Sequence, residues 1–182
     1  MQFSFLNGRI ITDGYLYEDV PYDVSANNLS VCFDGTGGVT KYLSVKTGKN
    51  YSPRAVFSLY KNGERVGAYA KKQTKMAGRT QEITIFGDGF QMEMKQFITK
   101  SDDAIFVEML FTSQEEVDIT ALYGTGLVDE IPAFSCDGEW KDIRDNFFYQ
   151  LQVSVCGQKR VRFVLSYEGS QAYCDGLLES FD

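Results

Sequence analysis

Apolar and polar residues alternate with a period of two along most of the chain. In Phe90–Ile98, Tyr149–Val155 and Val161–Tyr167, apolar side chains occupy nearly every second position. This period places one face of a strand on a core and the other in water, which is typical of half-buried β-strands. Shorter runs of the same kind are Leu29–Phe33, Val39–Val45, Ala55–Tyr60 and Val117–Tyr123. The pattern predicts a chain built almost entirely of strands.

Glycine-containing turns separate these runs. Asn62-Gly63 joins two strand-like runs and is typical of a two-residue β-hairpin. We expect further hairpins at Gly87-Asp88-Gly89 and at Gly157-Gln158. The stretch Ile105–Phe111 is apolar on both faces apart from Glu108, so it predicts a central strand covered on both sides.

The runs amount to about a dozen antiparallel strands, too many for one flat sheet. The sequence therefore predicts an all-β fold, a large two-layer antiparallel β-sandwich with almost no helix. One candidate helix lies in Ser170–Asp182, where Tyr173, Leu177 and Leu178 form an apolar stripe. This stripe either packs on the sandwich or contacts a continuation of the chain. Without an internal repeat or a linker, residues 1–182 are expected to form a single domain.

The chain contains no histidine, and this absence excludes more chemistry than any motif does. Ser-His-Asp and Cys-His nucleophile systems, HExxH zinc sites and facial triads all require imidazole. Carboxylates, Lys, Tyr and Cys remain, so glycoside chemistry is the most accessible enzyme class. We expect no metal site and no cofactor.

The four cysteines, Cys32, Cys136, Cys156 and Cys174, form no CxxC pair, which argues against a zinc ribbon or a thioredoxin-type motif. The first residues lack the basic segment and apolar core of a secretory signal. No apolar run approaches the roughly 20 residues of a membrane-spanning helix. We expect a cytoplasmic protein with no membrane partner and four reduced thiols. Two disulfides are the alternative for a chain exported by another route.

Charge is distributed unevenly along the chain. The segment from Lys41 to Arg79 carries ten basic residues and one acid, Glu64, so its net charge is +9 and that of the remainder is −16. Interleaved tyrosines would suit a nucleic-acid surface, but nucleic-acid binders usually have a basic domain overall. With an isoelectric point of about 4.7, the segment is expected to balance acidic neighbours, and no nucleic-acid partner is expected.

Two irregular stretches carry candidate functional residues. The turn Asp34–Gly38 is rich in glycine, but it lacks the GK[ST] ending of a phosphate loop, which argues against a nucleotide site. The second stretch, residues 124–146, is longer than a structureless connection usually is in a compact domain. It combines aromatic rings with acids and an arginine, a mixture that suits contact with a sugar or a protein partner. The predicted contact residues are Phe134, Asp137, Glu139, Trp140 and Arg144.

Glu108 is a separate candidate, because it lies between Val107 and Met109 in an apolar run. Burial would raise the pKa of its carboxyl group and make it a functional candidate. The alternative is a carboxylate that pairs with a basic residue on the sheet.

Three segments carry a resemblance to a known family. They are the strand-turn run Asn7–Asp13, the run Leu29–Tyr42 with its glycine-rich turn, and the pair Ile105–Phe111 and Val117–Tyr123. Together they resemble the N-terminal β-supersandwich domain of helical-barrel glycoside hydrolases and phosphorylases of the cellobiose phosphorylase type. The resemblance implies a domain that supports a catalytic barrel and contributes loops to its rim. In that family the catalytic carboxylates lie in the barrel, so the resemblance implies no catalytic residue here.

The functional expectation is a non-catalytic accessory domain of a carbohydrate-active enzyme, a glycoside hydrolase or phosphorylase. Its expected partners are carbohydrate or the catalytic domain of the same protein, with a homodimer as a further partner. Two alternatives remain open: a stand-alone carbohydrate-binding module, and a structural or dimerisation sandwich without a ligand.

Overall fold

The computed structural model describes residues 1–16, 21–51, 57–67, 69–124, 132–138, 140–143 and 148–181, with the backbone alone at 124, 140–143 and 148. Within these ranges the elements follow one another as β1 (Gln2–Leu6), β2 (Arg9–Tyr15), β3 (Tyr22–Ser25), β4 (Leu29–Phe33), β5 (Val39–Ser44), β6 (Phe57–Lys61), β7 (Glu64–Arg65), β8 (Lys71–Ala77), β9 (Thr80–Phe86), β10 (Gln91–Ile98), β11 (Ile105–Gly124), β12 (Ala133–Cys136), β13 (Trp140–Ile143), β14 (Phe148–Ser166) and α1 (Gln171–Glu179). The predicted all-β fold is confirmed, with antiparallel pairing throughout these strands.

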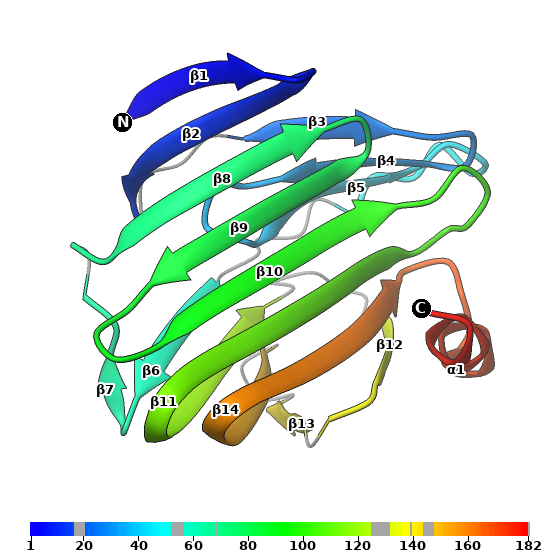
Figure 1. Cartoon of the computed structure of the whole chain (residues 1–182). Coiled ribbons are helices and arrows are strands. Elements are labelled where there is room, and N and C mark those ends of the chain that lie inside the picture. Colours follow the sequence, from blue (N-terminus) through cyan, green and yellow to red (C-terminus); the bar gives the residue numbers. More distant parts are fainter. Residues whose placement is uncertain are drawn as a thin grey trace.

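The sandwich has two layers (Figure 1). The first layer follows the order β1-β2-β8-β9-β10-β11-β14-β12. The second layer contains the separate sheet β3-β4-β5 together with β6, β7 and β13. The far halves of β11 and β14 curl over behind the first layer and belong to the second layer as well. We call the face of the first layer that meets the second its inner face, and the opposite face its outer face.

The period-two pattern determines which face each side chain occupies. In β10, Met92 and Met94 are 0% and 1% exposed on the inner face, whereas Glu93 and Lys95 are exposed on the outer face. One continuous apolar core joins these residues to strands of the second layer, including Phe33 of β4. Burial of this apolar surface is the main stabilising contribution to such a fold.

The hairpin predicted at Gly157-Gln158 is wrong. Gly157 has φ 83°, as a turn glycine often does, but it lies inside the continuous strand β14. It pairs with Ser113 of β11, beside a β-bulge between Ser113 and Val117. A bulge bends and twists a strand without reversing it. The runs on either side are therefore two halves of one strand that passes from one layer to the other.

Two further expectations need correction. Residues 124–146 are not one structureless connection, because β12 and β13 lie within them and pair with β14. Ile105–Phe111 is central, but its outer face is covered only in part: Phe106 packs in a cluster with residues of α1, whereas Glu108 and Leu110 are half-buried. The predicted hairpins at Asn62-Gly63 and Gly87–Gly89 are confirmed.

The C-terminal helix α1 begins after Ser170, whose Oγ accepts a hydrogen bond from the Tyr173 backbone N–H at 3.2 Å. Its apolar stripe packs on the sandwich around Phe106, Val164 and Phe181. No helix in the described part of the chain has the length and apolar character needed to cross a bilayer.

Candidate functional site

Three exposed aromatic rings gather at the β1–β2 side of the outer face. Tyr15 ends β2 and pairs with Lys71 of β8, which in turn pairs with Phe86 of β9. These three side chains therefore form one cross-strand row. Tyr69, just before β8, joins them, because its ring meets that of Tyr15 edge-on at a centroid distance of 6.2 Å. Large apolar groups exposed together often mark a binding surface.

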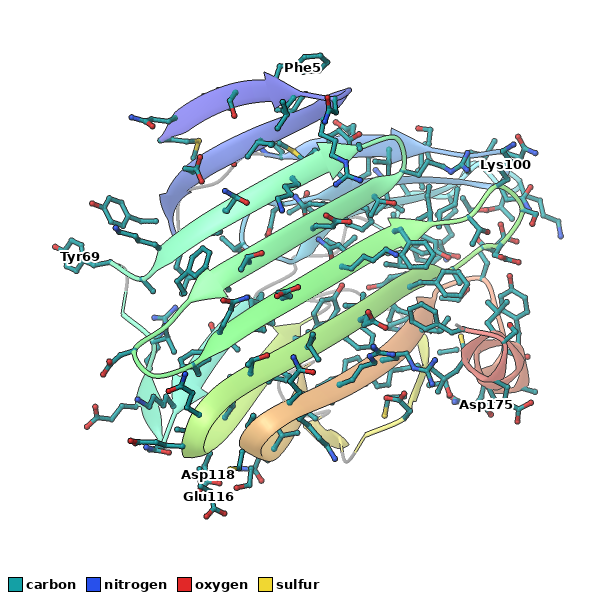
Figure 2. All side chains as sticks on the ribbon, viewed as in Figure 1. Phe5, Tyr69, Lys100, Glu116, Asp118 and Asp175 are labelled. Atoms are coloured by element: carbon teal, nitrogen blue, oxygen red, sulfur yellow. The ribbon has the colours of Figure 1, made fainter. Side chains whose placement is uncertain are left out.

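The rings are unusually accessible for side chains of this size. Tyr69 is 86% exposed, Tyr15 48% and Phe86 47%. Figure 2 shows Tyr69 projecting from the edge of the molecule, away from the ribbon. The edge-on geometry of the tyrosine pair is one that aromatic quadrupoles favour, so it holds both rings in a defined orientation.

Two hollows flank these rings. One has a volume of about 730 Å³ and lies between the β6–β7 hairpin and the turn before Phe90, with Tyr69, Lys71 and Phe86 in its lining. The other, about 490 Å³, is lined in part by Tyr15 and shares Lys71 and Phe86 with the first. Both volumes fall in the range of about 300–1,000 Å³ that small-molecule sites occupy. We call the three rings and the two hollows the aromatic cleft.

Polar side chains lie beside the rings. Gln73 donates a hydrogen bond from Nε2 to Asp13 Oδ1 at 2.9 Å on the outer face. On the other side of the rings, in the lining of the larger hollow, Lys61 Nζ lies 2.5 Å from the backbone oxygen of Asp88 and 3.9 Å from the Asp88 carboxylate. Amide, carboxylate and ammonium groups next to flat apolar rings are the combination that binds a ligand with both hydroxyl groups and an apolar face.

Sequence reasoning missed the aromatic cleft, although one signal was present. In β9, Phe86 has the same parity as Glu82 and Thr84, so it lies on the polar face of its strand. Tyr15 shares its face with Asp13 in the same way. An aromatic residue on the polar face of a strand predicts an exposed ring. That Tyr15 and Phe86 share one cross-strand row depends on β8 pairing between β2 and β9.

Two of the predicted contact residues have well-defined intramolecular partners. The ring of Phe134 stacks on that of Tyr149 with centroids 3.9 Å apart. Asp137 accepts hydrogen bonds from the Arg162 backbone N–H at 2.6 Å and from its Nε at 2.7 Å. Trp140 pairs with Leu151 through its backbone.

The side chains of Trp140, Glu139 and Arg144 lie outside the described residues. Contact between a ligand and the five predicted residues therefore stays a prediction. A hollow of about 680 Å³ next to Asp137 and Gly138 shows that this end of β12 is accessible.

Glu108 lies on the outer face with its side chain 29% exposed, and its Oε2 is 3.7 Å from Arg160 Nε. It also belongs to a row of alternating charge that crosses the sheet, in which Glu82 pairs with Lys95, Lys95 with Glu108, and Glu108 with Arg162. Opposite charges on neighbouring strands stabilise a sheet. The structure thus agrees with the alternative in which Glu108 pairs with basic residues.

Two basic residues of the segment from Lys41 to Arg79 lie next to acidic residues. Lys41 Nζ lies 2.6 Å from Asp23 Oδ1 in the second layer, and Lys75 pairs with Glu82 in the charge row. Lys72 is 4% exposed and points between the layers.

The glycine-rich turn Asp34–Gly38 is anchored inside the sandwich. Asp34 accepts a hydrogen bond on its carboxylate from the Gly38 backbone N–H at 2.8 Å. Lys72 donates to the backbone oxygen of Gly35, and Gln81 donates to that of Asp34 at 3.1 Å. A buried carbonyl without a partner would be costly, so these bonds give the turn a structural role.

Comparison with known proteins gives a likeness in fold alone. No family model matches the chain, and no curated protein matches it. The periplasmic domain of YidC from Thermotoga maritima has a similar structure at 11% identity and a TM-score of 0.46, with 99% of this chain and 97% of that one covered. A putative kojibiose phosphorylase from the human microbiome is similar at 8% identity and a TM-score of 0.48, and the match spans 98% of this chain but 35% of the phosphorylase. At these identities neither protein's function is transferred to this chain.

Proposed function

We propose that this chain is a non-catalytic accessory domain of a carbohydrate-active enzyme and that it binds sugar at the aromatic cleft. The observation that carries the proposal is the edge-on pair of Tyr15 and Tyr69 together with exposed Phe86, which lines both hollows along with polar groups. Sugar rings have apolar C–H faces and polar edges, so they stack on exposed aromatic side chains while neighbouring polar groups bind their hydroxyls.

A non-catalytic role agrees with the chemistry that the side chains offer. Glu108, the carboxylate that stood out in the sequence, faces Arg160 on the sheet. The retaining and inverting mechanisms of glycoside hydrolysis require two carboxyl groups across the scissile bond. Predicted contacts from Phe134, Asp137, Glu139, Trp140 and Arg144 would form a second surface of the same domain.

The proposal is tested by glycan-array binding with the isolated chain, followed by titration with the oligosaccharides that bind. Binding of at least one class of glycan, without hydrolysis or phosphorolysis, is the expected result. A folded chain that binds no glycan contradicts the proposal and favours a structural or interaction sandwich.

A second use of the aromatic cleft is contact with a catalytic domain of the same protein. Exposed Tyr69 and Phe86 would serve as anchors in such an interface, since aromatic residues are enriched among residues that dominate binding energy. Soluble sugars distinguish the two uses, because an interface anchor has no affinity for them.

A further inference from the structure

Strand β1 forms an uncovered end of the first layer. Among the described residues it pairs with β2 alone, and its side chains are all exposed. Phe3 and Phe5 pair with Thr12 and Ile10 and so face the inner side of the sheet, yet they are 64% and 74% exposed. Figure 2 shows Phe5 at the free edge of β1, beyond the rest of the sheet. The second layer therefore leaves this end of the inner face open.

The turn between β1 and β2 determines which backbone groups point outwards. Asn7 and Gly8 have φ 51° and 76°, as in a two-residue hairpin turn, so Leu6 and Arg9 form a hydrogen-bonded pair. Hydrogen-bonded and non-hydrogen-bonded pairs alternate along an antiparallel ladder. Phe3 and Phe5 therefore direct their N–H and C=O groups away from β2. The edge offers two donors and two acceptors to an incoming strand.

The edge has none of the usual protection against pairing with another chain. Natural edge strands are commonly interrupted by charged residues, proline or bulges. Gln2–Leu6 contains no charge and no proline, and its pairing with β2 continues without a bulge. Leu6 and Ile10 add apolar surface, at 59% and 41% exposure.

We propose that β1 pairs antiparallel with β1 of a second copy, about a two-fold axis at Ser4. This register places Phe3 of each copy opposite Phe5 of the other. Because both residues direct their backbone groups to the open edge, the two pairs form four backbone hydrogen bonds. The four rings then lie in two neighbouring cross-strand rows and form one apolar cluster on the inner side, next to Ile10 of each copy. The symmetric order Phe-Ser-Phe favours a second copy, because the same residues supply both sides of the contact.

Charge does not oppose this pairing. Ser4 lies in the same cross-strand row as Ile11 and Lys75. Across the proposed axis the two Lys75 side chains would be five strand spacings apart, about 24 Å. That distance exceeds the Debye length of about 8 Å at physiological salt, so their repulsion is screened. One strand pair buries less than the roughly 1,200 Å² of a stable interface, which makes the dimer weak and dependent on concentration.

The same axis would align two aromatic clefts. It runs perpendicular to the joined sheet, so the outer faces of both copies point in one direction. Tyr15 lies four residues beyond the partner of Ser4 in β2, which places the two Tyr15 side chains about 30 Å apart. If the aromatic cleft binds sugar as proposed above, the dimer would bind one polysaccharide at two points and gain avidity.

Sedimentation equilibrium over a range of chain concentrations tests the dimer. The wild-type chain is expected to dimerise reversibly, and Phe5→Lys to raise the dimer dissociation constant at least tenfold, because it adds a charge at the edge. Val45→Lys is the matched control, since Val45 is 51% exposed in the turn after β5. A wild-type chain that stays monomeric up to millimolar concentration overturns the proposal, as does a dimer that Phe5→Lys leaves unchanged.

Cross-linking tests the register independently. The two copies of Ser4 would form a non-hydrogen-bonded pair with Cα atoms about 4.5 Å apart, within the range that a disulfide spans. In a Cys156→Ser background, which removes the exposed native thiol, Ser4→Cys is expected to give covalent dimer much faster than Gln2→Cys. Equal rates for the two variants would contradict the register. Neither test depends on sugar binding.

Discussion

Phe86 and Tyr15 illustrate how far a single residue can be placed from the sequence. The alternation in their strands assigns both to the polar face, and the structure finds both rings exposed. Their partner Tyr69 lies in a connection, where no period applies. Tyr15 and Phe86 are brought together by β8, and this pairing order is a tertiary property. The exposure of Tyr15 and Phe86 was therefore predictable from the sequence, but the convergence of the three rings on one site was not.

Gly87→Ala is expected to destabilise the fold at the floor of the aromatic cleft. A Cβ on Gly87 would lie 2.1 Å from the ring of Phe90, which is 6% exposed and lines the larger hollow. Forced displacement of a packed ring costs about 1–3 kcal/mol of unfolding free energy, measurable by urea denaturation. Gly67→Ala is the matched control, because nothing lies within 4 Å of the added Cβ. Equal stability of the two variants would contradict this packing.

Glu168→Gln is expected to reduce the amount of stability that the fold loses at acidic pH. The Glu168 carboxylate accepts hydrogen bonds from Tyr51 Oη at 2.7 Å and from Thr47 Oγ1 at 2.9 Å. These bonds, and above all the one from Tyr51, lower the pKa of Glu168 below its ordinary value of 4.5. A lowered folded-state pKa gives stability that is present above about pH 4.5 and lost as pH falls through the folded pKa.

Thermal melts between about pH 6 and pH 3 measure this effect. The wild-type chain should lose more stability over this window than Glu168→Gln. Glu115→Gln, at the exposed bend of β11, controls for the loss of one negative charge. Parallel pH profiles for the wild type and Glu168→Gln would show that the two hydrogen bonds do not hold the carboxylate in its charged form.

At the scale of elements, the sequence predicts strands well and their ends less well. Leu29–Phe33 is β4 with the same bounds, whereas two pairs of predicted runs are the long strands β11 and β14. The cause is physical: a turn and an exposed bend both require polar residues and both accept a glycine at positive φ. In this fold the bend lies at the residues between Ser113 and Val117 in β11 and at Gly157, which has a positive φ, in β14. Figure 2 shows Glu116 and Asp118 extending from it. Only the strand pairing distinguishes the two cases.

The helix α1 offers a test at this scale. Ser170→Ala removes the side-chain oxygen that accepts the Tyr173 backbone N–H. Loss of such an N-cap typically costs about 1 kcal/mol, so a lower midpoint of urea unfolding is expected. Ser170→Asp keeps an acceptor in the same place and should retain most of the stability. If the alanine and aspartate variants are equally stable, the cap contributes nothing to the fold.

At the scale of the whole molecule, the sandwich leaves two surfaces of one layer uncovered. The aromatic cleft lies on the outer face, and the apolar edge of β1 lies beside it on the inner side. The sequence predicted two layers because a dozen half-buried strands need a second sheet. It could not predict where the second layer ends, because that depends on how β11 and β14 bend. The exposed apolar surface of β1 arises from that boundary.

Calorimetric titration of a glycan selected on the array tests the central claim most directly. Tyr69→Ala should leave the fold intact, since Tyr69 is 86% exposed, and should weaken sugar binding about tenfold or more, which corresponds to about 1.4 kcal/mol. Phe5→Ala is the matched control, because it removes a ring of 74% exposure outside the aromatic cleft, and it should leave the affinity per site unchanged. Sugar binding that survives Tyr69→Ala undiminished, or that falls equally in both variants, would contradict a sugar site at the aromatic cleft.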